Sequence, residues 1–492
     1  MNYETFKKFS RPGLIIPVYR KFNADFITPV IAYLKIREAG KHSFLLESVI
    51  RGEQVGRYSF LSQEPYLIQK FTDNKTITIA DHKNKIHKED FFDLLQHQLK
   101  DYDLLLTEEL PRFTCGAVGY VGYEMIGQIE KLPEPKIDVI GTDDALFGFY
   151  NQLIAFDHLK NEVILIANVF INENSDDYQL FQEAQNRLDH LQDKLNRPFD
   201  NSLEFKADWK TEGANFTKND FLKAVEKSRE YIFAGDIFQT VISQRFSVAY
   251  SGDSFQVYRT LRNINPSPYM FYLDFLDYQV IGSSPEPIIR AEDGELEIIP
   301  LAGTRQRGED KNEDEALAEN LLKDPKELAE HVMLVDLARN DVGRISEYGS
   351  VKVKDFKTIQ KYSHVMHIIS RVTGKLRKGL TVVDAFKSAF PAGTVSGAPK
   401  IRAMEIINEL EPQKRGIYAG AIGYFNYGGN MDLCIGIRTI VASRDRMYYQ
   451  AGAGIVADSI PENEYQETLN KCKALRRAIE QADGGINDFI YR

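Results

Sequence analysis

Cysteine is scarce in this sequence, and the cysteines that occur form no recognisable pattern. Cys115, Cys434 and Cys472 are the only three among 492 residues. Their odd number and wide spacing give neither a disulfide framework nor a cysteine-based metal site. This usage fits a reducing, intracellular setting.

Long hydrophobic runs are also missing. No apolar stretch approaches the roughly 20 residues that a membrane-spanning helix needs. The N-terminal MNYETFKKFSRPG lacks the apolar core of a signal peptide. We therefore expect a cytoplasmic protein that does not interact with membranes.

The chain has no excess of positive charge. Its 61 Lys and Arg residues are outnumbered by 71 Asp and Glu, which gives a net charge of -10. A nucleic-acid-binding protein would usually show a basic face, so we expect no nucleic-acid partner. The hydrophobic content of 43% and the charged content of 27% are ordinary for a globular enzyme. The length allows two or more large domains.

The pattern along the chain predicts an α+β fold. Short strand-like runs alternate with turns, and many of them occur as hairpin-like pairs. We therefore expect mostly antiparallel β-sheets flanked by helices. Residues 196–215 are polar and poor in periodicity, which places a boundary there. We expect an N-terminal part over residues 1–205 and a second part over 206–492 that carries the chemistry.

Three local features of the second part are also predicted. ELEIIPLAGTR has the pattern of a hairpin, and the run LCIGIRTIVA that of a strand with Arg438 inside it. Two helices are expected to divide at Pro325, because proline interrupts a helix interior but suits its first position.

Two pairs of glutamates lie three residues apart in helical stretches: Glu327/Glu330 and Glu464/Glu467. This spacing places each pair on one helix face. Two acidic faces without cysteine ligands favour a hard divalent cation, most plausibly Mg²⁺.

Simpler roles are open for two of these glutamates, Glu327 and Glu467. Asp324 can cap its helix, which puts Glu327 at the capping-box position. Lys471 can pair with Glu467 four residues earlier. Ser459 and Glu462 have the pattern of caps for the last helix, which leaves Glu464 and Glu467 for another role. Glu330 has no such role, and an unpaired carboxylate is costly among apolar neighbours.

Most of the other segments allow two interpretations. A buried Arg438 needs a carboxylate, from a ligand or from an internal glutamate. The loop FPAGTVSGAPK can bind an anion at the start of a helix or form an ordinary turn. The glycines of AGAGIVA allow the backbone to approach a ligand closely. His364 and His367 are each a possible proton donor or a core residue.

Taken together and in order, the motifs resemble those of the chorismate-binding enzyme family. The strings are GSSPEPIIR, PLAGTRQRG, KELAEHVMLVDLARNDVGRI, YSHVMHIISRVTG, FPAGTVSGAPK, RGIYAGAIGYF, IRTIVA and AGAGIVADS followed by ENEYQET. They cover roughly the last 280 residues, and LLES with NPSPYMFYL extends the likeness to the whole chain. Within the family the sequence most resembles the anthranilate synthases (component I). The resemblance implies an αββα-type fold.

The resemblance also implies roles for individual residues. Glu330 and Glu467 would hold Mg²⁺, with Glu327 and Glu464 in an outer shell. The catalytic positions would be Glu286 as general acid, His367 in pyruvate elimination, Gln239 and Thr304. The substrate positions would be Gly303, Thr394, Tyr418, Arg438, Gly452, Ala453, Gly454 and Lys471.

Two positions distinguish branches of the family. Gln239 stands where similar isochorismate and salicylate synthases carry a lysine base, and an amide cannot activate water. Ala302 stands where many aminodeoxychorismate synthases carry a nucleophilic lysine. Both favour Mg²⁺-dependent amination of chorismate at C2 by ammonia, followed by loss of pyruvate to give anthranilate. The alternatives are an aminodeoxychorismate synthase and a catalytically silent amino-acid sensor.

The likeness further implies a partner and an inhibitor. The chain has no Gly-x-Cys-x-Gly nucleophile motif, so a separate glutamine amidotransferase subunit would supply ammonia within a hetero-oligomer. L-Tryptophan would act as feedback inhibitor. Its site would comprise Glu47, Ser48, Asn265, Pro268, Tyr269, Met270, Phe271 and Cys434, which could otherwise be strand-core residues.

Overall fold

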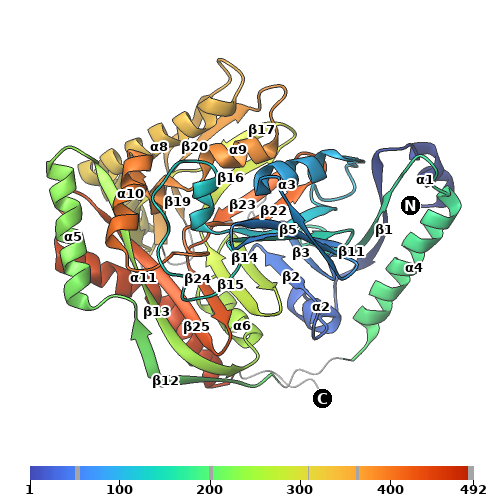
Figure 1. Ribbon diagram of the computed structural model, residues 1–492, viewed down its shortest axis with the longest axis horizontal. Coiled ribbons are helices and arrows are strands. Elements are labelled where there is room, and N and C mark those ends of the chain that lie inside the picture. Colours follow the sequence, from blue (N-terminus) through green and yellow to red (C-terminus); the bar gives the residue numbers. More distant parts are fainter. Residues whose placement is uncertain (50–55, 199–202, 309, 362–364, 486–492) are drawn as a thin grey trace.

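The computed structural model describes residues 1–49, 56–198, 203–308, 310–361 and 365–485. Two large β-sheets occupy the middle of the molecule, and helices cover their outer faces (Figure 1). The helices are α1 (Tyr3–Phe9), α2 (Pro29–Ile36), α3 (Phe91–Lys100), α4 (Asp177–Asn196), α5 (Lys218–Phe233), α6 (Phe255–Ile264), α7 (Lys311–Lys323), α8 (Pro325–Ile345), α9 (Val382–Ala389), α10 (Lys400–Leu410) and α11 (Pro461–Asp483), with 3₁₀ turns η1 (Tyr123–Gln128) and η2 (Gly393–Val395).

The first sheet has 13 strands. Its order is β12-β13-β25-β24-β15-β14-β2-β3-β10-β11-β1-β7, with β21 paired to β13. The strands are β1 (Leu14–Asn23), β2 (Ser43–Glu47), β3 (Tyr58–Gln63), β7 (Asp103–Leu104), β10 (Gln152–Asp157), β11 (Glu162–Phe170), β12 (Phe205–Ala214), β13 (Gln239–Gly252), β14 (Tyr269–Asp274), β15 (Tyr278–Ser284), β21 (Gly397–Ala398), β24 (Thr439–Ser443) and β25 (Arg446–Ile455). Apart from the parallel pair β1–β7, its described pairings are antiparallel.

The second sheet has 12 strands in the order β18-β20-β17-β16-β23-β22-β8-β9-β4-β5-β6, with β19 paired to β20. The strands are β4 (Leu67–Thr72), β5 (Lys75–Ala80), β6 (Lys83–His87), β8 (Gly116–Val121), β9 (Ala145–Tyr150), β16 (Pro287–Glu292), β17 (Glu295–Ile298), β18 (Leu301–Gln306), β19 (Lys352–Lys361), β20 (Val365–Lys375), β22 (Ala421–Asn426) and β23 (Met431–Ile435).

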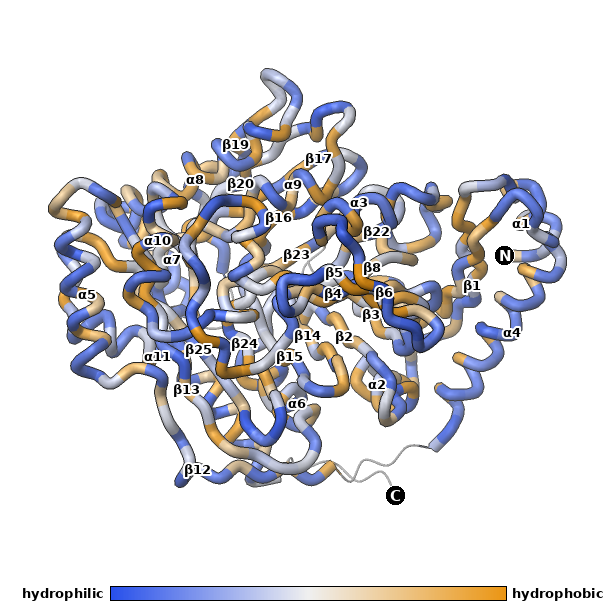
Figure 2. The backbone as a smooth tube through the Cα atoms, in the orientation of Figure 1, coloured by the Kyte–Doolittle hydropathy of each residue, from blue (hydrophilic) through white to orange (hydrophobic). Residues whose placement is uncertain are grey.

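The two sheets and the helices on their outer faces form four layers, and three apolar clusters lie between these layers. Phe44 and Val280 of the first sheet pack with Tyr120 and Ile422 of the second in one buried cluster between the sheets. A second cluster joins the first sheet to α2, α4, α6 and α11, and a third joins the second sheet to α3 and α9. Figure 2 shows the outlying α4 as a largely hydrophilic helix with scattered hydrophobic positions, as a helix with one buried face requires. The expected α+β fold of stacked, mostly antiparallel sheets flanked by helices is confirmed.

The predicted hairpin in ELEIIPLAGTR is wrong. Strands β17 and β18 do not pair with each other; both pair with successive parts of β20, at Val372–Lys375 and Val365–Ile369. Pro300 lies between them and cannot donate a ladder hydrogen bond. The two strands therefore follow one another along the same side of β20 instead of forming a hairpin.

The predicted strand through Arg438 is also wrong, because the chain changes sheets there. β23 belongs to the second sheet and β24 to the first, and Arg438 lies in the connection with a φ of 51°. A similar crossing joins β15 to β16 at Glu286. The two crossings are hydrogen-bonded to each other, since Ser283 N–H donates to Arg438 O at 3.1 Å and Ile435 N–H donates to Glu286 O at 3.0 Å.

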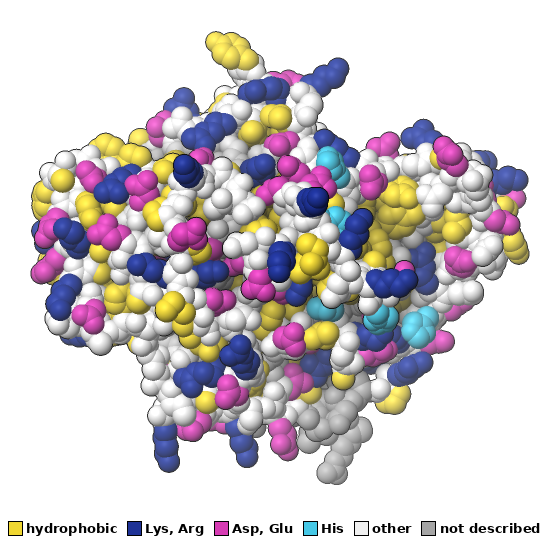
Figure 3. All heavy atoms as spheres, in the orientation of Figure 1, with side chains coloured by type: hydrophobic (Ala, Val, Ile, Leu, Met, Phe, Trp, Pro, Cys, Tyr) yellow, Lys and Arg dark blue, Asp and Glu magenta, His cyan; other side chains and the backbone are white. Residues whose placement is uncertain are grey.

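The division at residue 205 stays a prediction. Both sheets contain strands from before and after it, and Phe205–Ala214 forms β12, which pairs with β13. No helix in the described part of the chain is long and apolar enough to cross a membrane. On the face shown in Figure 3, acidic and basic side chains are interspersed.

Candidate active site

Glu286 occupies the crossing from β15 to β16 and is only 8% exposed. Thr394, in η2, donates a hydrogen bond from Oγ1 to Glu286 Oε1 at 3.1 Å. Burial raises the pKa of the Glu286 carboxyl to about 8, although the Thr394 hydrogen bond and the charge of Lys471 act in the opposite direction. Glu286 is therefore mostly protonated at neutral pH and can donate a proton.

His367 lies on β20 and faces β18. Its Nδ1 lies 2.8 Å from the carbonyl oxygen of Gly303. A carbonyl only accepts, so Nδ1 carries the proton and Nε2 is the basic nitrogen. Burial and the charge of Arg438 lower the pKa of His367, while the bond to Gly303 raises it. A neutral imidazole in this tautomer can take up a proton. Thr304 follows Gly303 in β18, and His364 lies outside the described residues.

The strand pair β13–β25 forms another wall of the site. Gly452, Ala453 and Gly454 lie opposite Ser243, Ile242 and Val241 in the ladder. A Cβ atom at Gly454 would lie 2.7 Å from Nε2 of the buried Gln239, so only glycine allows this side chain its position. The Oε1 atom of Gln239 is buried and has no hydrogen-bond partner in the described structure. The amide thus offers one unsatisfied acceptor at the site.

Arg438 is the main cationic group beside these walls. It donates from Nη1 to the backbone oxygen of Lys471, and it makes no salt bridge with any described carboxylate. Its charge influences the pKa values of Tyr418 and His367, so these side chains are close. A guanidinium without an internal carboxylate fits an anionic ligand. The predicted alternative, an internal glutamate, is not found among the described residues.

Lys471 connects the glycine wall to α11. Its Nζ donates to Gly452 O at 2.9 Å and forms an ion pair with Glu467 at 2.6 Å. The Tyr418 hydroxyl also lies against Gly452, where a Cβ atom would be 2.8 Å away. The structure thus brings the predicted catalytic and substrate residues into one region.

The two glutamate pairs lie on α8 and α11, and Glu330 is close enough to Glu467 for their charges to interact. Burial, together with the charges of Glu327 and Glu467, raises the pKa of Glu330 against the opposing effect of Lys471. Burial and Glu467 likewise raise the pKa of Glu464. Glu330 has no hydrogen bond or ion pair among the described residues. Mutual repulsion around a carboxylate without a partner is a situation that a bound cation would relieve.

The donor chemistry fits a hard divalent cation, because every donor is a carboxylate oxygen. The side chains are not arranged as a coordination shell: among the described residues no three His, Cys, Asp or Glu side chains are grouped for a metal. Glu327 is paired with Arg305 at 3.3 Å, and Glu467 with Lys471. A cation would therefore compete with these two pairs.

The predicted caps are partly right. Asp324 caps α8 by accepting from Lys326 N and Glu327 N. The cap of α11 is wrong, because Ile460 holds that position without a side-chain bond. Ser459 instead accepts from Val456 N at 3.0 Å, and Glu462 pairs with Lys218.

A separate cavity of about 260 Å³ contains most of the residues predicted to bind tryptophan. Its lining includes Glu47, Ser48, Pro268, Tyr269, Met270, Phe271 and Cys434. Ser48 Oγ is buried and has no hydrogen-bond partner among the described residues, so this part of the structure leaves one polar group of the cavity unsatisfied. Glu47 already accepts from Tyr258 at 2.5 Å and from Arg262 at 3.1 Å. Asn265 is not part of the lining and donates to Ser283 Oγ at 2.9 Å.

Sequence reasoning missed the aromatic side of this cavity. Phe113 stacks on Tyr424 with ring centroids 4.2 Å apart, and Phe60 meets Phe113 edge-on at 5.4 Å. Arg290 and Asp432 line it as an ion pair at 3.3 Å. The residues lie on β3, β16, β22, β23 and the segment before β8, so only strand order brings them together. An apolar wall with polar groups at one end is typical of a small-molecule site.

Known proteins resemble this chain over nearly its whole length. The family described as chorismate binding enzyme matches residues 53–477. Anthranilate synthase component 1 of Acetivibrio thermocellus is 46% identical over 476 residues, covering 95% of this chain and 96% of that protein. The protein of the same name from Aquifex aeolicus is 43% identical over 487 residues, covering 98% of each.

Solved structures show the same likeness. The crystal structure of anthranilate synthase component I from Streptococcus pneumoniae TIGR4 has a TM-score of 0.76 and 39% identity, covering 93% of this chain and 99% of that one. The isochorismate synthase MenF of Escherichia coli shares the fold with a TM-score of 0.72 at 19% identity, covering 97% and 98%.

The chain belongs to the chorismate-binding enzyme family. Within the family, it is similar along nearly its whole length to proteins named anthranilate synthase component 1.

Proposed function

We propose that the chain is the synthase subunit of an anthranilate synthase. It converts chorismate and ammonia to anthranilate, pyruvate and water, as the first committed step of tryptophan biosynthesis. The observation that carries the proposal is Gln239 against Gly454 in the wall of the site. An amide there can accept a hydrogen bond but cannot deprotonate water, whereas neutral ammonia is already a nucleophile.

Different residues of the site bind the substrate, donate a proton and remove a proton. Arg438 and Tyr418 hold the enolpyruvyl carboxylate, with backbone contacts from Gly452, Ala453 and Gly454. Glu286 donates its proton to the C4 hydroxyl as that group leaves and ammonia bonds to C2. Pyruvate elimination then requires removal of the C2 proton, and the basic nitrogen of His367 is suited to take it.

Mg²⁺ is the proposed metal, held by Glu330 and Glu467 with Glu327 and Glu464 nearby. When bound, it supplies Lewis acidity and a fixed point for the ring carboxylate. The carboxylates supply the oxygen donors that Mg²⁺ prefers, and the raised pKa of Glu330 supports a cation among them.

A partner and an inhibitor complete the proposal. A glutamine amidotransferase subunit would deliver ammonia within a cytoplasmic hetero-oligomer, since relatives are named component 1. L-Tryptophan would inhibit from the 260 Å³ cavity, where Ser48 offers an unsatisfied hydroxyl. An amphipathic amino acid matches aromatic rings beside a polar end.

Two other functions are less well supported. An aminodeoxychorismate synthase of the lysine-dependent kind would need a nucleophile where this chain has the buried Ala302. A silent amino-acid sensor would have no need of the protonated Glu286 held by Thr394.

The test is an assay of the purified chain with chorismate, Mg²⁺ and an ammonium salt. Anthranilate fluorescence and enzymatic pyruvate detection are followed in parallel. Equal amounts of the two products support the proposal. Formation of 4-amino-4-deoxychorismate would favour the first alternative, and an inert protein that binds tryptophan would favour the second.

A further inference from the structure

Arg415 is a large charged side chain that is almost fully buried, with 1% of its surface exposed. Its fork holds Glu411 in two contacts, from Nε at 2.9 Å and Nη2 at 2.6 Å. Nη1 donates to Val395 O and Nη2 to Val241 O, both at 2.7 Å. One guanidinium thus joins the end of α10, the turn η2 and strand β13.

The two backbone contacts each lie one or two residues from a candidate site residue. Val395 follows Thr394, which holds the carboxyl of Glu286. Val241 lies opposite Gly454 in the ladder and two residues after Gln239. The guanidinium also lies over the ring of Tyr418, 5.6 Å from its centroid. Arg415 itself touches none of the groups assigned to the reaction except Tyr418.

Glu411 extends the connection. Its Oε1 accepts from both the N–H and the hydroxyl of Ser243 at 2.8 Å, and Ser243 Oγ accepts from Gln450 at 2.7 Å. The pair is therefore saturated with hydrogen bonds, as a buried ion pair must be. Such a pair holds backbone segments in fixed positions, because any shift leaves a buried charge unpaired.

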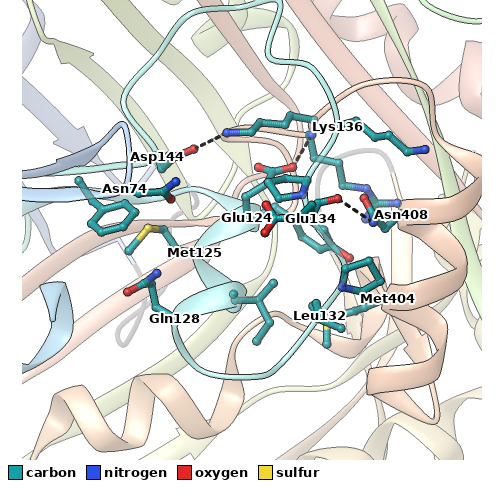
Figure 4. Close-up of a pocket in the computed structure, with 18 of the residues that line it drawn as sticks. Asn74, Glu124, Met125, Gln128, Leu132, Glu134, Lys136, Asp144, Met404 and Asn408 are labelled. Carbon is teal, nitrogen blue, oxygen red and sulfur yellow. Dashed lines mark hydrogen bonds and ion pairs between the residues drawn. The ribbon is translucent and has the colours of Figure 1, made fainter.

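The opposite side of Arg415 faces a cavity of about 640 Å³ that does not include the substrate residues. Tyr123 lies there with its ring 4.7 Å from the guanidinium. Glu124 accepts from the backbone N–H groups of Arg415 at 2.7 Å and Gly416 at 3.0 Å. Figure 4 shows Glu124 in the middle of this cavity, with Met404 and Asn408 of α10 across from it. Contacts with Glu124 and Tyr123 thus also hold the backbone and the guanidinium of Arg415 in place.

We propose that Arg415, locked by Glu411, is a positioning residue that sets the geometry between Glu286, Tyr418 and the strand bearing Gln239. This inference rests on the proposed function for its kinetic test. Arg415 acts through Val395, and hence Thr394, on the proton donor, and through Val241 on the wall opposite Gly454. Small displacements of reacting groups cost large factors in rate.

The test compares Arg415→Lys with a matched control, Arg37→Lys. Arg37 also forms a two-contact ion pair, with Asp253 at 2.5 and 3.2 Å, and lies over a ring, Phe255, at 5.3 Å. Lysine keeps the charge, but its single nitrogen cannot reproduce the planar fork that spans Glu411, Val395 O and Val241 O. We expect kcat of Arg415→Lys to fall at least about tenfold at saturating chorismate and ammonium, while Arg37→Lys stays within about twofold of the unmodified protein.

A second readout separates positioning from general destabilisation. The hydrogen bond from Thr394 lowers the pKa of Glu286. Loosening that bond should therefore move the alkaline fall of kcat to higher pH in Arg415→Lys and leave it in place in Arg37→Lys. An unchanged alkaline fall, or equal rate losses in both variants, would overturn the proposal.

Two further measurements cover the remaining outcomes. Ser243→Ala removes one bond to Glu411 without removing charge, so it should fold and show a smaller shift of kcat in the same direction. Hydrogen exchange needs no product: the segment 393–398 should exchange faster in Arg415→Lys than in Arg37→Lys. A protein that makes no anthranilate refutes the proposed function, and unchanged exchange at 393–398 refutes the positioning role.

Discussion

The hydroxyl of Thr394 donates a hydrogen bond of 3.1 Å to the buried carboxyl of Glu286. The two residues are 108 positions apart, on a 3₁₀ turn and at a crossing between sheets. The bond fixes the orientation of a group that burial keeps protonated near neutral pH. A buried acid with a fixed direction is what protonation of a leaving hydroxyl requires.

The first prediction concerns the pH dependence of turnover. Because the pKa of Glu286 is raised to about 8, kcat should fall roughly tenfold per pH unit above that value as the acid form disappears. Free ammonia must be kept constant by adjusting total ammonium at fixed ionic strength, since otherwise its own titration hides the fall. Initial rates between pH 6.5 and 10 give the measurement, and a rate that stays level to pH 10 would contradict the assignment.

The raised pKa of Glu286 should also appear in the pH dependence of the folding stability. The folded pKa of Glu286 lies above the usual 4.5 of the free side chain. The neutral acid therefore stabilises the fold below pH 4.5, and this contribution is lost as pH rises toward 8. Glu286→Gln should lose less stability between pH 6 and 9, while kcat falls about 10² to 10⁴-fold. Urea unfolding at both pH values checks this, and parallel stability curves would refute it.

The second prediction concerns the nucleophile. Gln239→Lys introduces a basic side chain beside Gly454, which should lower the amination rate and give some hydroxylated product from water. Gln239→Leu is the matched control, because it removes the amide group, with its unsatisfied acceptor, without supplying a base. It should slow amination and yield no hydroxylated product. Chromatography of both reactions decides the point, and equal product mixtures would remove Gln239 from its assigned role.

The third prediction concerns the metal. Glu330→Gln and Glu467→Gln should each abolish Mg²⁺-dependent turnover, whereas Glu462→Gln, on the same helix as Glu467 but paired with Lys218, should retain it. Mg²⁺ at about 100 times its Kd should stabilise the unmodified protein by about 2.7 kcal/mol through linkage. Thermal unfolding with and without Mg²⁺ measures this. Equal metal stabilisation in Glu330→Gln would place the ion elsewhere.

The fourth prediction concerns tryptophan. Ser48→Ala removes the unsatisfied hydroxyl in the 260 Å³ cavity and should weaken tryptophan binding about tenfold, as loss of one buried hydrogen bond does. Phe113→Ala should weaken it further by removing a ring that stacks on Tyr424. Asn265→Ala is the comparison, because its side chain bonds Ser283 outside the lining. Calorimetry gives the tryptophan affinities of the three variants. If Asn265→Ala lost the most affinity, the tryptophan site would lie near Asn265 and not in this cavity.

The glutamate faces of the candidate site could be predicted from features that are local in sequence, whereas the roles of most other site residues came from the resemblance to the family. The spacing of Glu327 and Glu330 gives a helix face, and Asp324 with Pro325 marks where that helix begins. The strand-like runs likewise predicted mostly antiparallel sheets, while their stacking was implied by the resemblance. Such features depend on contacts within a few residues.

The rest depends on pairing between distant strands. Arg438 lies at a crossing between sheets, and its position follows from the pairing of β23 and β24 with different partners. Glu411, four residues before Arg415, gives a local signal for an ion pair. The contacts of Arg415 with the backbone carbonyls of Val241 and Val395 leave no signal in the sequence. Periodicity carries no strand order, so neither placement could be read from the sequence.

The most direct test of the proposed function follows the nitrogen atom. The purified chain is incubated with chorismate, Mg²⁺ and ¹⁵N-labelled ammonium, and the product is examined by NMR. We expect anthranilate with ¹⁵N on the carbon next to that bearing the carboxylate, and one pyruvate for each ring. Label at C4, an unlabelled hydroxylated ring or no product would contradict the account.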